Sequence, residues 1–252
     1  FKIRLLLLSP MPDYDQGYSE ERYGALGGQK ILEKENNHYE EILENLGAEY
    51  GDSVLELGSN DALLSEHLSE FYDMTCADVE RNPLMDAREY GRAENQLQVD
   101  AHRLPFQEDA FDYVVIPRVL HLDMVDGEEV LSEASRVAEK GFAFDVFSPS
   151  SLRAPYNPMM HRINEKMPKS NMHSRRKVEG IGPIDGILNG HEKERIDSFS
   201  DFIVPFGAFK KSDNESWVDF TEKANSFAEK WGKSSIPDLN SVNYYSVDLK
   251  DF

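Results

Sequence analysis

A short segment between an apolar run and a helix-like stretch carries the first residues that could do chemistry. Residues 54–62 read Val-Leu-Glu-Leu-Gly-Ser-Asn-Asp-Ala, with Glu56 near the end of the run and Gly58 in the turn after it. Nucleotide-like ligands of α/β proteins bind beyond the carboxyl ends of the strands. Gly58 allows close backbone approach, and Asn60 tolerates the left-handed conformation. An ordinary strand-to-helix turn would explain the segment equally well.

A second acid follows the next apolar run. Asp78 comes about 20 residues after Gly58, the spacing at which a Rossmann-type sheet places a carboxylate on ribose hydroxyls. Glu80 competes for the role, and a lone acid after a strand is often only a loop residue.

Apolar runs and helix-periodic stretches alternate along the chain, which predicts the elements that position these acids. Strands are expected at 53–57, 74–78, 97–99, 112–116, 142–147, 199–205 and 242–248, and helices at 29–46, 60–71, 83–90, 128–138 and 217–231. This alternation predicts a Rossmann-like α/β fold with a mostly parallel seven-stranded sheet and helices on both faces.

The regular alternation is lost after the fifth strand. We expect residues 1–50 to form an N-terminal extension and helix, and residues 51–252 to form the main domain. An irregular insertion at about 148–198 is expected as a lid or substrate-binding region. The stretch 1–10 precedes Met11 and is either part of the protein or sequence upstream of it.

An ordered series of motifs extends from residue 53 to residue 147. Val99-Asp100-Ala101 precedes Leu104-Pro105-Phe106, then Phe111-Asp112 opens an apolar run, and residues 133–137 read Glu-Ala-Ser-Arg-Val. The series resembles the class I S-adenosylmethionine-dependent methyltransferases, particularly their small-molecule, quinone or sterol-like branch. The resemblance implies a transferase that uses S-adenosyl-L-methionine and a small-molecule methyl acceptor.

The resemblance also implies roles for individual residues. Glu56 and Gly58 would line the methionine part of the cofactor. Asp78 would accept from the ribose hydroxyls, and Asp100 with Ala101 would meet the adenine. The other residues expected to bind the cofactor are Ser59, Asn60, Val79 and Pro117. Asn60 and Ala62 stand where the family usually has its second and third glycines. A degraded site in a non-catalytic binding or scaffolding protein is therefore an alternative, and so is a methyltransferase that acts on RNA or protein.

A catalytic group is harder to name, because methyl transfer needs mainly positioning and, for some acceptors, a base. His121 follows the fourth expected strand and is the candidate base, although a histidine packed at a strand end fits as well. Arg118, Arg175 and Arg176 are candidates for binding the substrate, the last two in a basic part of the insertion. No spacing of Cys or His indicates a metal site.

The net charge and the cysteine content indicate which classes of partner and which cellular compartment to expect. The 47 acidic residues outnumber the 27 basic ones, giving a net charge of −20. Such a surface disfavours nucleic acid and fits a halophilic source. The single cysteine, Cys76, fits a reducing compartment, and the longest aliphatic run, at 5–8, is too short to span a membrane. We expect a cytoplasmic protein, and the sequence is compatible with a homodimer.

Overall fold

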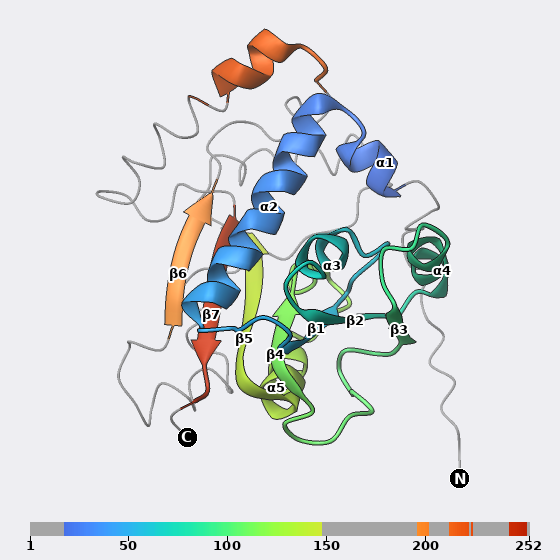
Figure 1. The fold of residues 1–252 in the computed structure, drawn as a ribbon, viewed down its shortest axis with the longest axis vertical. Coiled ribbons are helices and arrows are strands. Elements are labelled where there is room, and N and C mark those ends of the chain that lie inside the picture. The colour runs from blue at the N-terminus through green and yellow to red at the C-terminus, as the bar shows by residue number, and fades with distance from the viewer. Residues whose placement is uncertain (1–17, 148–195, 202–211, 222, 224–241, 251–252) are drawn as a thin grey trace.

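The sheet at the centre of the protein is mixed but mostly parallel. The computed structural model describes residues 18–147, 196–201, 212–221, 223 and 242–250 (Figure 1). Its strands lie in the order β3-β2-β1-β4-β5-β7-β6. They are β1 (Ser53–Leu57), β2 (Asp73–Asp78), β3 (Asn95–Gln98), β4 (Phe111–Ile116), β5 (Ala138–Phe147), β6 (Ile196–Asp201) and β7 (Val242–Asp248). Among the described strands, β7 alone runs opposite to the others, and it pairs antiparallel with both β5 and β6.

Helices cover both faces of this sheet. They are α1 (Tyr18–Tyr23), α2 (Leu26–Asn45), α3 (Leu63–Leu68), α4 (Arg81–Glu89) and α5 (Gly127–Val137). In Figure 1, α2 runs across one face of the strands and α5 lies behind the other. The structure confirms the expected Rossmann-like arrangement of parallel strands with helices on both sides.

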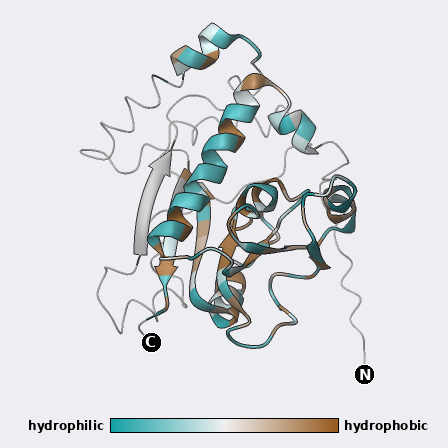
Figure 2. Cartoon of the chain, in the orientation of Figure 1, coloured by the Kyte–Doolittle hydropathy of each residue, from teal (hydrophilic) through white to brown (hydrophobic). Residues whose placement is uncertain are grey.

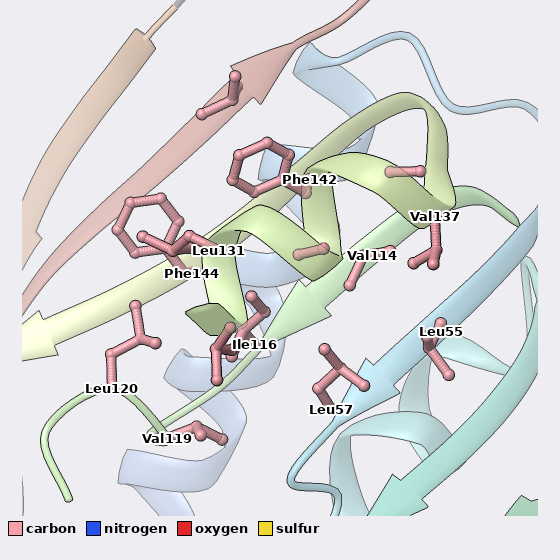
Figure 3. Packing of buried hydrophobic residues seen from close by; sticks show 14 of the residues in the cluster. Leu55, Leu57, Val114, Ile116, Val119, Leu120, Leu131, Val137, Phe142 and Phe144 are labelled. Carbon is pink, nitrogen blue, oxygen red and sulfur yellow. The ribbon is translucent and has the colours of Figure 1, made fainter. Parts of the chain in front are cut away.

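Alternation along the strands builds two cores. Leu55 and Leu57 of β1 join Phe142 and Phe144 of β5 against α5, in the cluster that Figure 3 shows. Val54 points to the opposite face and packs with residues of α2 and α3. Because side chains of a strand alternate, Glu56 projects to the face of Val54, beneath α2 and α3.

Helix α2 differs from its expected pattern in one informative way. Ile31, Tyr39 and Ile42 are buried, whereas Leu32, whose helical spacing from Tyr39 and Ile42 would also favour burial, is only half-buried. The buried stripe also contains Glu35 and Asn36. Figure 2 shows the mixed hydropathy of this helix beside the more apolar central strands. The face of α2 that meets the sheet is therefore partly polar.

Several element boundaries depart from the expected ones. Strand β5 begins at Ala138, before the expected start at 142, because α5 runs directly into it, and Gly141 lies inside the strand. A Cβ at Gly141 would lie 2.7 Å from the carbonyl oxygen of Val247, so close strand packing explains this glycine. Strand β3 spans Asn95–Gln98, so it starts and ends earlier in the sequence than the expected strand at 97–99.

The far edge of the sheet is formed by β6 and β7. Strand β6 begins at Ile196, inside the range expected for the insertion, so residues 196–198 belong to the sheet. The remainder of that insertion, at 148–195, lies outside the described residues. So does most of the expected helix at 217–231, of which residues 217–221 are helical.

Candidate active site

The turn between β1 and α3 is left-handed at three positions. The backbone φ angle is 75° at Gly58, 48° at Asn60 and 63° at Ala62. A Cβ at Gly58 would lie 2.2 Å from Cγ2 of Val119, so only glycine fits there without a shift. Asn60 and Ala62 thus keep a conformation that glycine adopts most easily.

Asp78 holds this turn at the end of β2. One carboxylate oxygen accepts a hydrogen bond from the backbone N–H of Asn60 at 2.8 Å, and the other accepts from Glu80 at the same distance. Burial raises the pKa of Asp78, and these backbone hydrogen bonds oppose the rise. Each oxygen keeps a lone pair that could accept a ligand hydroxyl.

Asp100 follows β3 and is fixed by His102. Its Oδ1 atom accepts from the backbone N–H of His102 at 3.0 Å and lies 2.6 Å from Nδ1 of the same residue. Nε2 of His102 accepts from the backbone N–H of Asp126 at 2.9 Å, which places the ring proton on Nδ1. Partial burial raises the pKa of Asp100, but the hydrogen bonds from His102 outweigh it and lower the pKa overall.

One pocket joins the turn after β1 to the carboxyl ends of β4 and β5. From the turn it is lined by Glu56, Gly58, Ser59, Asn60 and Asp61, from the chain after β4 by Pro117 and Arg118, and from β5 by Asp145. Helices α1, α2 and α3 supply the remaining wall: Ser19, Arg22, Tyr23, Leu32, Glu35, Asn36, Tyr39, Leu63 and Leu64.

A buried cluster of charges forms one end of this pocket. Arg118, with a left-handed φ of 57°, lies between two carboxylates. Its Nη2 is 2.5 Å from Glu35 Oε1, and its Nε is 3.2 Å from Asp145 Oδ1. Tyr39 donates to Asp145 Oδ2 at 2.8 Å, and Tyr23 donates to Glu35 at 3.0 Å. Removing one partner from such a cluster would leave a buried charge uncompensated.

Glu56 lies on the floor of the pocket, 2% exposed. Burial raises its pKa to about 8, although Ser65 opposes the rise by donating a short hydrogen bond to Oε2. A carboxyl group with this pKa is mostly neutral at pH 7, and a cation beside it would favour its ionised form. The floor therefore suits a positively charged ligand group.

The other predicted site residues lie elsewhere. Val79 is exposed just after β2, and Ala101 packs against the core near Asp100. His121 is not among the residues that line the pocket. Arg175 and Arg176 lie outside the described residues.

The sequence matches the family described as "Methyltransferase domain" over residues 55–144. This match covers β1 to β5, the strands that carry the turn, Asp78 and Asp100. Residues 55–144 therefore form a methyltransferase domain. The narrower quinone or sterol-like branch stays a prediction.

Solved structures share the fold at low identity. The Haloferax volcanii protein bound to the Trm112 methyltransferase activator is 17% identical, with a TM-score of 0.57 over 93% of this chain and 98% of that one. An S-adenosylmethionine-dependent methyltransferase from Thermotoga maritima is 12% identical, with a TM-score of 0.54 over 92% and 99%. Phosphoethanolamine N-methyltransferase 2 from Haemonchus contortus, complexed with S-adenosylmethionine, is 17% identical, with a TM-score of 0.55 over 84% and 52%. A search of curated proteins gives no match.

The pocket contains residues that sequence reasoning missed. Glu35, Tyr39 and Asp145 were not predicted as site residues, yet they line the pocket together. Two signals were present: Glu35 stands at a helical spacing from Ile31 and Tyr39, and Asp145 interrupts the apolar run of β5. A polar residue at a position patterned for burial is more informative than an exposed one.

Two kinds of feature are absent from the described part of the chain. Within the described residues, no group of histidine, cysteine, aspartate and glutamate side chains is placed to hold a metal ion. Among the helices of the same residues, none is both long and apolar enough to cross a bilayer.

Proposed function

We propose that the protein transfers the methyl group of S-adenosylmethionine to a small molecule. The pocket is the observation that carries this proposal, because it joins the Gly58 turn to an enclosed polar cluster at Arg118 and Asp145. Pockets with a few converging polar groups suit small ligands. A net charge of −20 also opposes binding to nucleic acid.

The residues of the pocket fit the cofactor in chemical type. When bound, S-adenosylmethionine supplies a methyl group on a positively charged sulfur. Glu56, Gly58, Ser59, Asn60 and Pro117 would line its methionine part. The raised pKa of Glu56 and the close approach allowed at Gly58 support this placement.

The nucleoside part would lie along the ends of β2 and β3. Asp78 and Val79 would bind the ribose, and Asp100 with Ala101 the adenine. The spare lone pairs of Asp78 and the fixed orientation of Asp100 support these roles. Arg118 would then stand between the cofactor and the acceptor.

Calorimetry tests the proposal directly. S-adenosylmethionine, S-adenosylhomocysteine and NAD are titrated into the protein at low and at molar salt. We expect binding of the first two and none of NAD. Transfer of labelled methyl is then measured with histamine, phosphoethanolamine, bulk RNA and protein. Cofactor binding without transfer to any acceptor would favour a non-catalytic binding protein.

A methyltransferase that works with an activator protein, on RNA or protein, is the second candidate, and one structural neighbour favours the activator. The Haloferax volcanii protein, which resembles this chain over nearly its whole length, was solved with a methyltransferase activator. If this chain has a similar partner, adding the Haloferax activator should shift its elution on size exclusion and raise methylation of RNA or protein. Labelling of small amines alone would support the first proposal.

The basic insertion remains a candidate for binding an anionic acceptor. Replacing Arg175 and Arg176 together by alanine should then impair turnover and leave cofactor affinity unchanged. Unchanged turnover would contradict this role and favour the interpretation that the two arginines form ion pairs with the acidic surface of the protein.

A further inference from the structure

The geometry points to Asp145 as the group that takes the proton from the methyl acceptor, and to an amine as that acceptor. This inference rests on the proposed function and concerns the end of the pocket away from the Gly58 turn. Asp145 is on β5, next to the chain that leaves β4 at Pro117 and Arg118. Both segments line the same pocket as Gly58 and Asn60.

The two oxygens of Asp145 are in unequal surroundings. Oδ2 accepts from the hydroxyl of Tyr39 at 2.8 Å and from the backbone N–H of Arg118 at 3.0 Å. Oδ1 accepts no hydrogen bond from any residue that the structure describes, although Nε of Arg118 lies 3.2 Å away. A buried carboxylate oxygen without a hydrogen-bond donor is costly. An N–H group of a ligand in the pocket would remove this cost.

The surroundings of Asp145 raise its pKa overall. The groups that face it are Arg118, Tyr39 and Glu35, with Tyr244 of β7 across the sheet. Burial raises the pKa of Asp145, whereas Arg118 and the hydroxyl of Tyr39 lower it. A carboxylate held in this balance can accept a proton more readily than an exposed one.

The same cluster explains the choice of an amine. Glu35 places a second buried carboxylate beside Arg118, and the rings of Tyr23 and Tyr39 line the adjoining wall. Carboxylates and aromatic faces are the groups that recognise organic cations. His121, the base expected from sequence, does not line this pocket.

The ammonium group of the acceptor first releases one proton to Oδ1 of Asp145, which leaves a lone pair on the nitrogen and turns the carboxylate into a neutral carboxyl group. The nitrogen then forms a bond to the methyl carbon while the carbon–sulfur bond breaks, and the electron pair of that bond stays on sulfur. The product leaves as a methylated ammonium ion, and water later removes the proton from Asp145.

Binding to the protein loaded with S-adenosylhomocysteine gives a test that does not depend on turnover. Histamine and phosphoethanolamine are titrated by calorimetry, with imidazole and ethyl phosphate as matched probes that lack the amine. We expect at least one amine to bind more than tenfold tighter than its matched probe, and D145N to abolish the difference. Equal binding of amines and matched probes would overturn the amine assignment.

The pH profile of methyl transfer to the amine that binds then tests the base. D145N should lower kcat by about 100-fold or more and remove the acidic limb of the profile, with the KM for S-adenosylmethionine unchanged. D112N is the matched control, since Asp112 forms its ion pair with Lys140 at the opposite end of β4. Its profile should equal that of the wild-type protein.

Y39F covers the case in which D145N does not fold. Loss of the Tyr39 hydroxyl removes one donor to Asp145, so the acidic limb should move to higher pH. An unmoved limb in Y39F, or an intact limb in folded D145N, would refute Asp145 as the base. Failure of the wild-type protein to bind S-adenosylhomocysteine would instead refute the proposed function.

Discussion

Replacing Glu56 by glutamine tests the placement of the cofactor, because it should change the number of protons that the protein releases when S-adenosylmethionine binds. Burial raises the pKa of Glu56 to about 8 in the ligand-free protein. At pH 7 about nine-tenths of the molecules therefore carry a neutral Glu56, since each pKa unit is a tenfold ratio. If the ammonium and sulfonium groups of S-adenosylmethionine lie against this side chain, binding should ionise it and release about 0.9 proton.

Calorimetry in two buffers of different ionisation enthalpy measures that release. The wild-type protein should also bind S-adenosylmethionine about tenfold more tightly at pH 9 than at pH 7, because the ionised fraction of Glu56 rises about tenfold. In E56Q the contribution of this side chain should vanish, leaving only protons from the ligand itself. S-adenosylhomocysteine keeps the ammonium group but lacks the sulfonium charge. Its proton release therefore measures the effect of the ammonium group alone.

Equal proton release by the wild-type protein and E56Q would refute the placement of positive charge beside Glu56. The same variant has a stability readout without cofactor. The pKa of Glu56 is about 8 in the folded protein but ordinary in the unfolded chain, so ionisation should cost stability as pH rises from about 4.5 to 8. E56Q should remove a loss on the order of a few kcal/mol, seen as a flatter curve of unfolding free energy against pH.

Three further outcomes are expected. D78N should weaken binding of S-adenosylmethionine by about 1.5–3 kcal/mol, and unchanged affinity in calorimetry would remove Asp78 from the ribose site. G58A should destabilise the protein more than its control G51A in urea unfolding, because both glycines have positive φ but only a Cβ at Gly58 meets another residue, Val119. The melting temperature should rise from low salt to molar KCl, because screening reduces repulsion within a chain of net charge −20; a flat response would remove the argument for a halophilic source.

The part of the fold between β1 and α5 was predictable from sequence because its signals are local. Alternation of apolar strands and amphipathic helices predicted a mostly parallel sheet, and the spacing from Gly58 predicted an acid at the end of β2. Element ends were less predictable where packing decides them. Strand β5 begins before its expected start at 142, and Gly141 inside it lies in close contact with β7.

The acceptor end of the site was not predictable because it depends on non-local packing. Glu35 reaches Arg118 only because α2 lies across the ends of β4 and β5. Arg118 could be named from its position after β4, but its left-handed φ and its two carboxylate partners could not. Sequence reasoning named the turn after β1 and missed the pocket residues opposite it.

The place of β7 in the sheet bears on the order in which the protein matures. Strand β7 inserts between β5 and β6, and the whole stretch 148–241 is synthesised before it. Until then the edge of β5 has no partner, and Tyr244, which accepts a hydrogen bond from Arg118 at 3.3 Å, is missing from the charge cluster. During translation, the cofactor turn can form while the acceptor end waits for the last strand. Under the proposed function, a nascent chain would bind the methyl donor before its binding site for the methyl acceptor is complete.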